Sequence, residues 1–246
     1  MKQIKYILAL LGIVLFFGCG DGGDLNEWQP LSDSVSKRII EYSQDDQIEK
    51  IHIYRINSEN LSISIANGEP KYISDWAKEL DAEIVINGAY FNKDFGPSGY
   101  LKINNERIGE LIFDQGKSGL IQINNGQFSI RDLAINPLQT GEELDFGLQS
   151  FPFLINDGNA AIKEDSGKTA RRTALGIDEE GHVYIIFADL IHISLYELMN
   201  KLIETNIDFT YVLNLDGGPS SGILIHNELK DSVTKVPSVI LFEKSL

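Results

Sequence analysis

Short runs in which apolar and polar side chains alternate recur along most of the chain. Residues 48–56 and 61–66 show this period, which is that of a strand with one buried face. Asn-Asn-Gly at 124–126 and Glu-Glu-Gly at 179–181 separate neighbouring runs and predict hairpin turns. We predict further strands over 83–86, 100–103, 107–108, 120–123, 128–130, 153–155, 173–177, 182–187, 209–215, 222–226 and 236–242.

A first amphipathic helix is predicted in the N-terminal half of the chain. Ile73, Trp76, Ala77 and Leu80 are spaced so that they fall on one helical face, and Ser74 is the expected cap at the start.

A second helix is predicted to begin after Ser194, which forms a capping box with Glu197. Its apolar face consists of Leu195, Leu198, Met199, Leu202 and Ile203. Many short strands with few helices predict an α+β domain, built on a large mixed and mostly antiparallel sheet with a few packed helices.

The first twenty residues have the layout of a secretory signal. Lys2 and Lys5 precede an apolar stretch over 7–17, which is too short for a membrane span. Cys19, the single cysteine of the chain, follows this stretch and resembles the cysteine that is lipidated in bacterial lipoproteins. An ordinary signal peptide with a chance cysteine is the alternative. We predict a lipoprotein-type signal over 1–18 and a lipid on Cys19, which would anchor the protein in a bacterial cell envelope, on its periplasmic or outer surface.

The segment after the cysteine is polar and acidic, and it contains several glycines at its start. This composition predicts a flexible tether over 19–47, which leaves 48–246 as a single domain. The whole chain has a formal net charge of −15. Such a charge argues against nucleic acid and against a basic patch for anionic lipid. A phosphorylated substrate remains compatible, because it needs only local positive charge.

The segment 211–221, Tyr-Val-Leu-Asn-Leu-Asp-Gly-Gly-Pro-Ser-Ser, is the strongest candidate for chemistry. An apolar strand would hold Asp216 at its exit, and the two glycines that follow let the backbone approach a ligand. Asn214 is an amide inside the apolar run, and Ser220 supplies a hydroxyl. The alternative is a plain turn, for which Asp-Gly is already a signal.

Three other segments also place polar side chains at strand ends. These are 87–92 (Asn-Gly-Ala-Tyr-Phe-Asn), 149–155 (Gln-Ser-Phe-Pro-Phe-Leu-Ile) and 171–177 (Arg-Arg-Thr-Ala-Leu-Gly-Ile). An arginine in the third suits a phosphate or carboxylate. Their plainer explanations are a turn with two core aromatics, an edge strand bent at proline, and a solvated strand end. The four histidines show no metal-binding spacing, and neither a phosphate-binding loop nor a serine-hydrolase elbow occurs.

Together these segments resemble the phosphodiester glycosidase family. The similarity is carried by 87–91, by 172–178 (Arg-Thr-Ala-Leu-Gly-Ile-Asp), by the helix after Ser194 and by 214–221, and it spans roughly 80–245. The family's last motif usually reads Asp-Gly-Gly-Gly-Ser, whereas this chain has Pro219 at the third glycine. Proline has no N–H, so this chain lacks the backbone amide that a glycine would offer to a substrate there.

The resemblance implies a hydrolase that cleaves the bond between a sugar and a phosphodiester in an envelope or extracellular glycan. Its transition state would be oxocarbenium-like, as in other glycosidases. Asp216 would be the nucleophile or general base and Arg172 would bind the phosphate. Asn87, Gln149 and Ser220 would orient substrate oxygens, and Tyr90 or Phe91 would form a floor for the sugar ring. The remaining expected substrate-binding residues are Gly88, Ser150, Thr173, Asn214, Gly217 and Gly218.

Two other functions stay open at this stage. One is a surface lipoprotein of the same fold that binds glycans without cleaving them. The other is a calcium-assisted hydrolase in which Asp216 and a second carboxylate, with Asp189 or Asp94 as candidates, hold the ion, because hard cations use oxygen ligands without a fixed spacing. The sequence itself requires no cofactor. If the enzymatic interpretation is right, Asn87, Gln149, Arg172 and Asp216 converge on one cleft.

Overall fold

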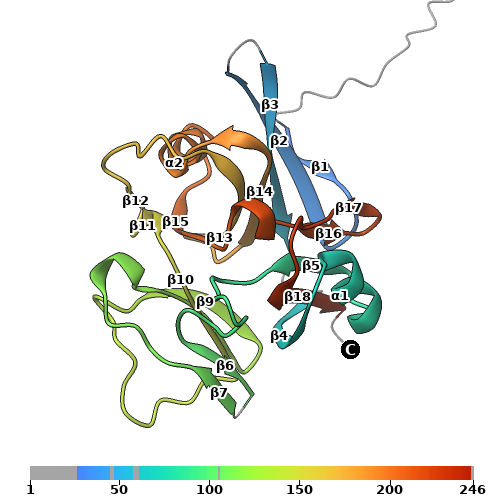
Figure 1. The fold of residues 1–246 in the computed structure, drawn as a ribbon. Helices are drawn as coiled ribbons and strands as arrows, with labels where there is room; N and C mark the ends of the chain where they lie inside the picture. Colours follow the sequence, from blue (N-terminus) through green and yellow to red (C-terminus); the bar gives the residue numbers. More distant parts are fainter. Residues whose placement is uncertain (1–26, 45–46, 58–60, 105, 245–246) are drawn as a thin grey trace, which may run out of the picture.

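The computed structural model describes residues 27–44, 47–57, 61–104 and 106–244 (Figure 1). The expected signal over 1–18, Cys19 and the start of the expected tether lie outside these described residues. Within the described residues, no helix is both long and apolar enough to cross a membrane.

The strands form three sheets in which the neighbouring strands are antiparallel. The first sheet has the order β1-β2-β3-β14-β13-β15-β11-β12. Its strands are β1 (Gln29–Pro30), β2 (Val35–Gln44), β3 (Gln47–Ile56), β11 (Phe153–Asn156), β12 (Asn159–Ala160), β13 (Ala170–Asp178), β14 (Val183–Ile193) and β15 (Phe209–Asn214).

The second and third sheets each have five strands. The second has the order β7-β6-β10-β8-β9, with β6 (Leu101–Ile103), β7 (Glu106–Gly109), β8 (Gly119–Asn124), β9 (Gln127–Asp132) and β10 (Phe146–Ser150). The third has the order β17-β16-β5-β18-β4, with β4 (Leu61–Lys71), β5 (Ile84–Asn87), β16 (Ile223–Ile225), β17 (Glu228–Lys230) and β18 (Val236–Lys244).

One apolar core is shared by all three sheets. Leu175 and Leu213 come to it from the first sheet, Leu101 from the second, and Ile84 and Phe242 from the third, and each of the five is buried. A core of this size places the sheets around a common centre, so the ends of strands from different sheets lie close together there.

The described part of the chain contains two α-helices, and each covers one sheet (Figure 1). Helix α1 (Ile73–Leu80) packs against the third sheet, and α2 (Leu195–Ile203) packs against β11 and β12 of the first. The Ser194–Glu197 capping box is confirmed at the start of α2. Ser74 does not cap α1; Tyr72 takes that position, and the Ser74 amide donates to the Asp231 carboxylate instead.

The antiparallel pairing and the small number of helices agree with the predicted fold class, but the balance does not. The chain is richer in strand than a balanced α+β protein, and its strands divide into three sheets where we expected one large sheet. The sequence pattern gives strand period and turns, whereas the division among sheets depends on long-range pairing such as that of β5 with β18.

The expected tether is wrong for residues 29–30 and 35–44, which belong to the first sheet as β1 and β2, and for Gln47, which begins β3. Strand β2 pairs with β3 along its whole length, from Val35 opposite Ile56 to Gln44 opposite Gln47. The segment is polar because it lies at the edge of the sheet, where polar and charged side chains are common. Composition alone therefore made an edge strand look like a linker.

Candidate active site

Three strand ends meet at the boundary between the first and third sheets. Asn87 ends β5, Asn214 ends β15, and Arg172 lies near the start of β13. Strands β13 and β15 are neighbours, with Ala174 directly opposite Asn214. Side chains two residues apart on a strand share a face, so Arg172 and Asn214 point to the same side of the sheet. The chain leaves β15 into Asp216, beside this face.

Asn87 holds the end of β5 against the segment that carries Asp216. Its Nδ2 donates to the Asp216 carbonyl at 2.8 Å and to the Gly88 carbonyl at 3.1 Å. Its Oδ1 accepts from the Gly222 amide at 3.1 Å. The side chain is fully buried, so Asn87 fixes the backbone around Asp216 and does not orient substrate oxygens as we had expected.

Asp216 is a partly buried carboxylate with few partners. Its Oδ1 accepts from the Gly217 amide at 3.0 Å, and the Ser220 hydroxyl is a second donor. Burial raises the pKa of Asp216 above its ordinary value, and these two hydrogen bonds only partly offset the rise. Among the described residues, no cation forms an ion pair with this carboxylate. A carboxylate with this environment is a stronger base than one in water, which suits a nucleophile or general base.

Asn214 orients Tyr90. Its Nδ2 donates to the Tyr90 hydroxyl at 2.7 Å, to the Leu215 carbonyl at 2.7 Å and to the Phe151 carbonyl at 3.2 Å. The Tyr90 ring stacks on Phe151 with centroids 4.5 Å apart. The ring is thus fixed by Phe151, and the hydroxyl by Asn214.

Arg172 is a buried cation whose described neighbours include no acid. Its Nε donates to the Ile193 carbonyl at 3.3 Å, and Nη2 donates to the Lys168 carbonyl at 2.6 Å. Nη1 lies beside Gly217, 3.4 Å from where a Cβ on that residue would be. Burial lowers the pKa of Arg172, but a guanidinium still keeps its proton. A charge that is desolvated without a counter-ion is costly, and an anionic ligand would relieve that cost.

The loop after Asp216 accommodates the proline that departs from the family motif. Residues 218–220 form one turn of 3₁₀-helix, and Pro219 lies in its first part, where an amide has no partner within the turn. The Pro219 carbonyl accepts from the Val233 and Thr234 amides. Gly218 has φ +62, which favours glycine. Its amide donates to none of the described residues, so the loop retains one unused N–H beside Asp216.

Gln149 does not join the site, and the expectation of four converging residues is wrong for this one. Its Oε1 accepts from the Tyr100 and Ile112 amides, and its Nε2 donates to the Ile112 and Lys117 carbonyls, all within 3.0 Å. The amide is therefore saturated by backbone partners of the second sheet and its loops.

Three other residues that we expected to bind substrate instead contact the protein itself. The Ser150 hydroxyl donates to the Asn214 carbonyl at 2.7 Å. Thr173 follows Arg172 and so points to the opposite face of β13, where it is fully buried. Phe91 stacks on Phe95 and packs against the cluster beneath α1.

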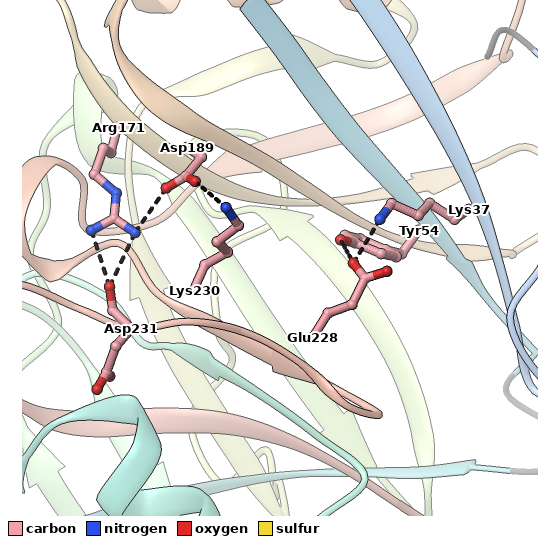
Figure 2. A network of polar contacts seen from close by, with 7 residues as sticks. All are labelled: Lys37, Tyr54, Arg171, Asp189, Glu228, Lys230 and Asp231. Atoms are coloured by element: carbon pink, nitrogen blue, oxygen red, sulfur yellow. Dashed lines mark hydrogen bonds and ion pairs between the residues drawn. The ribbon is translucent and has the colours of Figure 1, made fainter.

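Asp189, a candidate for the second calcium ligand, is already paired with two cations. Figure 2 shows its carboxylate between two cations, Arg171 Nη2 at 3.2 Å and Lys230 Nζ at 2.9 Å. Arg171 also donates twice to the Asp231 carbonyl, at 3.1 Å. Both oxygens of Asp189 therefore already have cationic partners.

The described residues contain one group with the spacing of metal ligands, and it lies elsewhere. Asp178, Glu180 and His182 place one ligand atom each within 4.8 Å of one another. However, the Asp178 carboxylate accepts from the Tyr184 hydroxyl, from His182 Nδ1 and from two backbone amides. These hydrogen bonds already use the Asp178 carboxylate, so they account for the closeness of the three side chains as part of a hydrogen-bonded turn.

Some residues of the site were missed by reasoning from sequence. Phe151 supports Tyr90, and Lys117 lies over the Phe151 ring with Nζ 5.0 Å from the ring centroid. Phe151 belonged to a segment we had noted, but its partner could not be read from periodicity. The Lys168 and Ile193 carbonyls that hold Arg172 are backbone groups, for which the sequence has no signal.

Comparison with known proteins identifies a family for this chain. The family model for phosphodiester glycosidases matches residues 81–243. No curated protein sequence matches the chain at a significant level.

Solved structures share the fold at low sequence identity. The catalytic domain of zebrafish N-acetylglucosamine-1-phosphodiester alpha-N-acetylglucosaminidase, auto-inhibited by its pro-peptide, has a TM-score of 0.63 and 16% identity, over 88% of this chain and 86% of that one. A hypothetical protein from Synechocystis has a TM-score of 0.57 and 13% identity, over 86% of this chain and 62% of that one. A Burkholderia pseudomallei protein described as exported has a TM-score of 0.53 and 10% identity, over 80% and 74%.

Proposed function

This chain belongs to the phosphodiester glycosidase family, and we propose that it hydrolyses the bond between an anomeric carbon and the phosphate of a sugar phosphodiester. The observation that carries the proposal is that two side chains of opposite charge, buried Arg172 and partly buried Asp216, lie near one loop without a counter-ion among the described residues. Arg172 is a cation without an acidic partner among the described residues, and Asp216 is a carboxylate without a cationic one. A substrate with an electrophilic carbon next to an anion would satisfy both.

Asp216 would act on the anomeric carbon, either directly as a nucleophile or by removing a proton from water. Burial raises its pKa, which makes the carboxylate more basic, while the Gly217 amide and the Ser220 hydroxyl hold it in position. Arg172 would bind the phosphate with charge-assisted hydrogen bonds and stabilise the negative charge that develops as the bond breaks. The unused Gly218 amide, two residues after Asp216, is a further donor in the same loop.

A single carboxylate suits this leaving group. Most glycosidases need a second carboxyl as general acid because an alkoxide leaves poorly. Here the departing group is a phosphomonoester dianion, whose conjugate acid has a pKa of about 6. It leaves without prior protonation, so the reaction does not need a second carboxylate, and none of the described acids is among the groups that shift the pKa of Asp216.

The substrate screen uses α and β sugar 1-(methyl phosphate) diesters of common hexoses and of N-acetylglucosamine, which the zebrafish protein's name identifies as that enzyme's sugar. Free sugar and methyl phosphate are measured together, and we expect both from the wild type. Asp216→Asn should lower the rate by at least about 10²–10⁴-fold. Release by Asp216→Asn at the wild-type rate would exclude the assigned role. Saturable binding without product would instead support a glycan-binding protein.

The same assay tests the calcium alternative. Turnover that persists in a chelator is expected, because the carboxylate of Asp189 is occupied by Arg171 and Lys230. Activity that disappears with chelator and returns with calcium would favour the metal-assisted hydrolase.

We also propose that the protein is attached to a bacterial envelope membrane by a lipid on Cys19, so that its substrate is a glycan of the envelope or its surroundings. The sequence around Cys19 supports this. Labelled fatty acid should enter the wild type and not Cys19→Ala, and the variant should leave the membrane fraction. Equal labelling of both proteins would contradict the anchor.

A further inference from the structure

The Tyr90 hydroxyl is oriented so that its proton has no partner in the described structure. Asn214 Nδ2 faces the Leu215 and Phe151 carbonyls as well as Tyr90, so the donor end of that amide points to the hydroxyl. A flipped amide would place oxygen against two carbonyl oxygens. The Tyr90 oxygen therefore accepts from Asn214, and its own proton points elsewhere.

The ring that carries this hydroxyl is held on its apolar side. Phe151 stacks on Tyr90 with a centroid separation of 4.5 Å, and Lys117 lies over Phe151 at 5.0 Å. Tyr90 is half-buried, so part of the residue remains accessible. A donor that is fixed in advance costs little reorganisation when charge develops beside it.

Tyr90 lies near both buried charges of the site. Asp216 raises the pKa of Tyr90 and Arg172 lowers it, although burial has the largest effect. Arg172 in turn has Tyr90 as its electrostatic partner. In the proposed substrate the anomeric carbon faces Asp216 and the phosphorus faces Arg172. The oxygen that joins carbon to phosphorus would then lie between these two charges, on the side of the site to which Tyr90 belongs.

We propose that Tyr90 is a further catalytic residue, whose hydroxyl donates a hydrogen bond to the bridging oxygen of a sugar 1-phosphodiester. This rests on the proposed function. As the bond between the anomeric carbon and this oxygen breaks, both bonding electrons pass to the oxygen, which becomes part of a phosphomonoester dianion. Asp216 or water forms the new bond to carbon. Tyr90 keeps its proton and stabilises the charge that gathers on the oxygen.

The acidities decide between a hydrogen bond and a full proton transfer. Burial raises the pKa of Tyr90 to about 12, whereas the departing phosphomonoester has a pKa of about 6. The proton therefore favours tyrosine by about 10⁶-fold. The role is that of an oxyanion-hole donor, distinct from the floor for a sugar ring that the sequence suggested.

The test compares wild type and Tyr90→Phe on two matched substrates, one with oxygen and one with sulfur between the anomeric carbon and phosphorus. The variant keeps the ring stack and leaves Asn214 with two carbonyl acceptors. With the oxygen substrate we expect kcat to fall about 10²–10³-fold with little change in KM. With the sulfur substrate the two proteins should differ far less, because sulfur is a weak acceptor.

Equal losses on both substrates, or no loss on the oxygen substrate, would overturn this inference alone. A wild type that cleaves neither substrate would overturn the proposed function together with it. Thermal unfolding checks that Tyr90→Phe folds. If it does not fold, difluorotyrosine at position 90 keeps the hydroxyl but lowers its pKa. The rate of this substituted protein should then fall at alkaline pH, where the hydroxyl loses its proton. An unchanged pH profile would contradict the donor role.

Discussion

Asn87 donates its side-chain amide to the main-chain carbonyl of Asp216 at 2.8 Å, across 129 positions of sequence. The two residues end strands of different sheets, or follow them directly, since Asn87 closes β5 and Asp216 comes two residues after β15. The hydrogen bond therefore joins the third sheet to the first at the proposed nucleophile. A residue that is fully buried thus determines where a reacting carboxylate lies.

Replacing Asn87 by alanine is expected to weaken both fold and catalysis. The Asp216 and Gly88 carbonyls and the Gly222 amide would lose their partner in a buried place. We expect the free energy of unfolding to fall by about 2–4 kcal/mol, from denaturant titration, and kcat to fall with it. Asn92→Ala is the matched control: it removes an exposed asparagine of the same segment, and its effect should be smaller. Equal effects of the two changes would contradict the role of Asn87 in fixing the backbone around Asp216.

Gln149 should behave as a structural residue. Changing it to leucine leaves two amides and two carbonyls of the second sheet and its loops without their partner. Unfolding should become easier by about 2–5 kcal/mol, while KM for a confirmed substrate stays close to the wild-type value at a temperature where the variant is folded. A large rise in KM without loss of stability would restore the role that the sequence suggested.

Asn87 and Gln149 show which parts of the fold and the candidate site could be predicted from the sequence. The turn at 124–126 was predictable because asparagine and glycine tolerate the positive φ that Asn125 and Gly126 adopt. The helix after Ser194 was predictable because its cap involves residues close together in sequence. The segments around Asp216 and Arg172 were recognisable by residue type. The partners of Gln149 and Asn87 could not be predicted. A buried amide needs hydrogen bonds, but the sequence does not show which donors and acceptors satisfy it. Strand β2 was missed for a related reason: its place depends on pairing with β3.

Arg172 should be the residue through which phosphate stabilises the protein. At inorganic phosphate about 100-fold above its Kd, the wild type should gain about 2.7 kcal/mol. For a chain of this length that corresponds to a rise of about 5–10 °C in Tm. Arg172→Ala should lose this rise at equal ionic strength.

The adjacent arginine gives a matched control for that measurement. Arg171 already binds the Asp189 carboxylate and the Asp231 carbonyl (Figure 2). Arg171→Ala should lower Tm in chloride yet retain the increment caused by phosphate. If both variants lose the increment, or neither does, Arg172 is not the specific phosphate ligand.

Asp216→Asn is expected to abolish most activity and, at neutral pH, to make the protein more stable. Burial raises the folded pKa of Asp216, so the folded state holds this group better when it is protonated. The stabilising contribution of the wild-type carboxyl is then fully present below its unfolded pKa of about 3.9, and it is lost as the pH rises through the folded value. Asparagine resembles the protonated form at every pH. Tm of Asp216→Asn should therefore exceed that of the wild type at pH 7, and the difference should close near pH 4. Asp94→Asn, which removes one negative charge at an exposed site, is the control for the change in net charge. The same shift places the acid limb of wild-type kcat/KM above the pH expected for a solvated aspartate. A variant less stable than wild type at pH 7 would mean that the hydrogen bonds from Gly217 and Ser220 outweigh the cost of burying the charge.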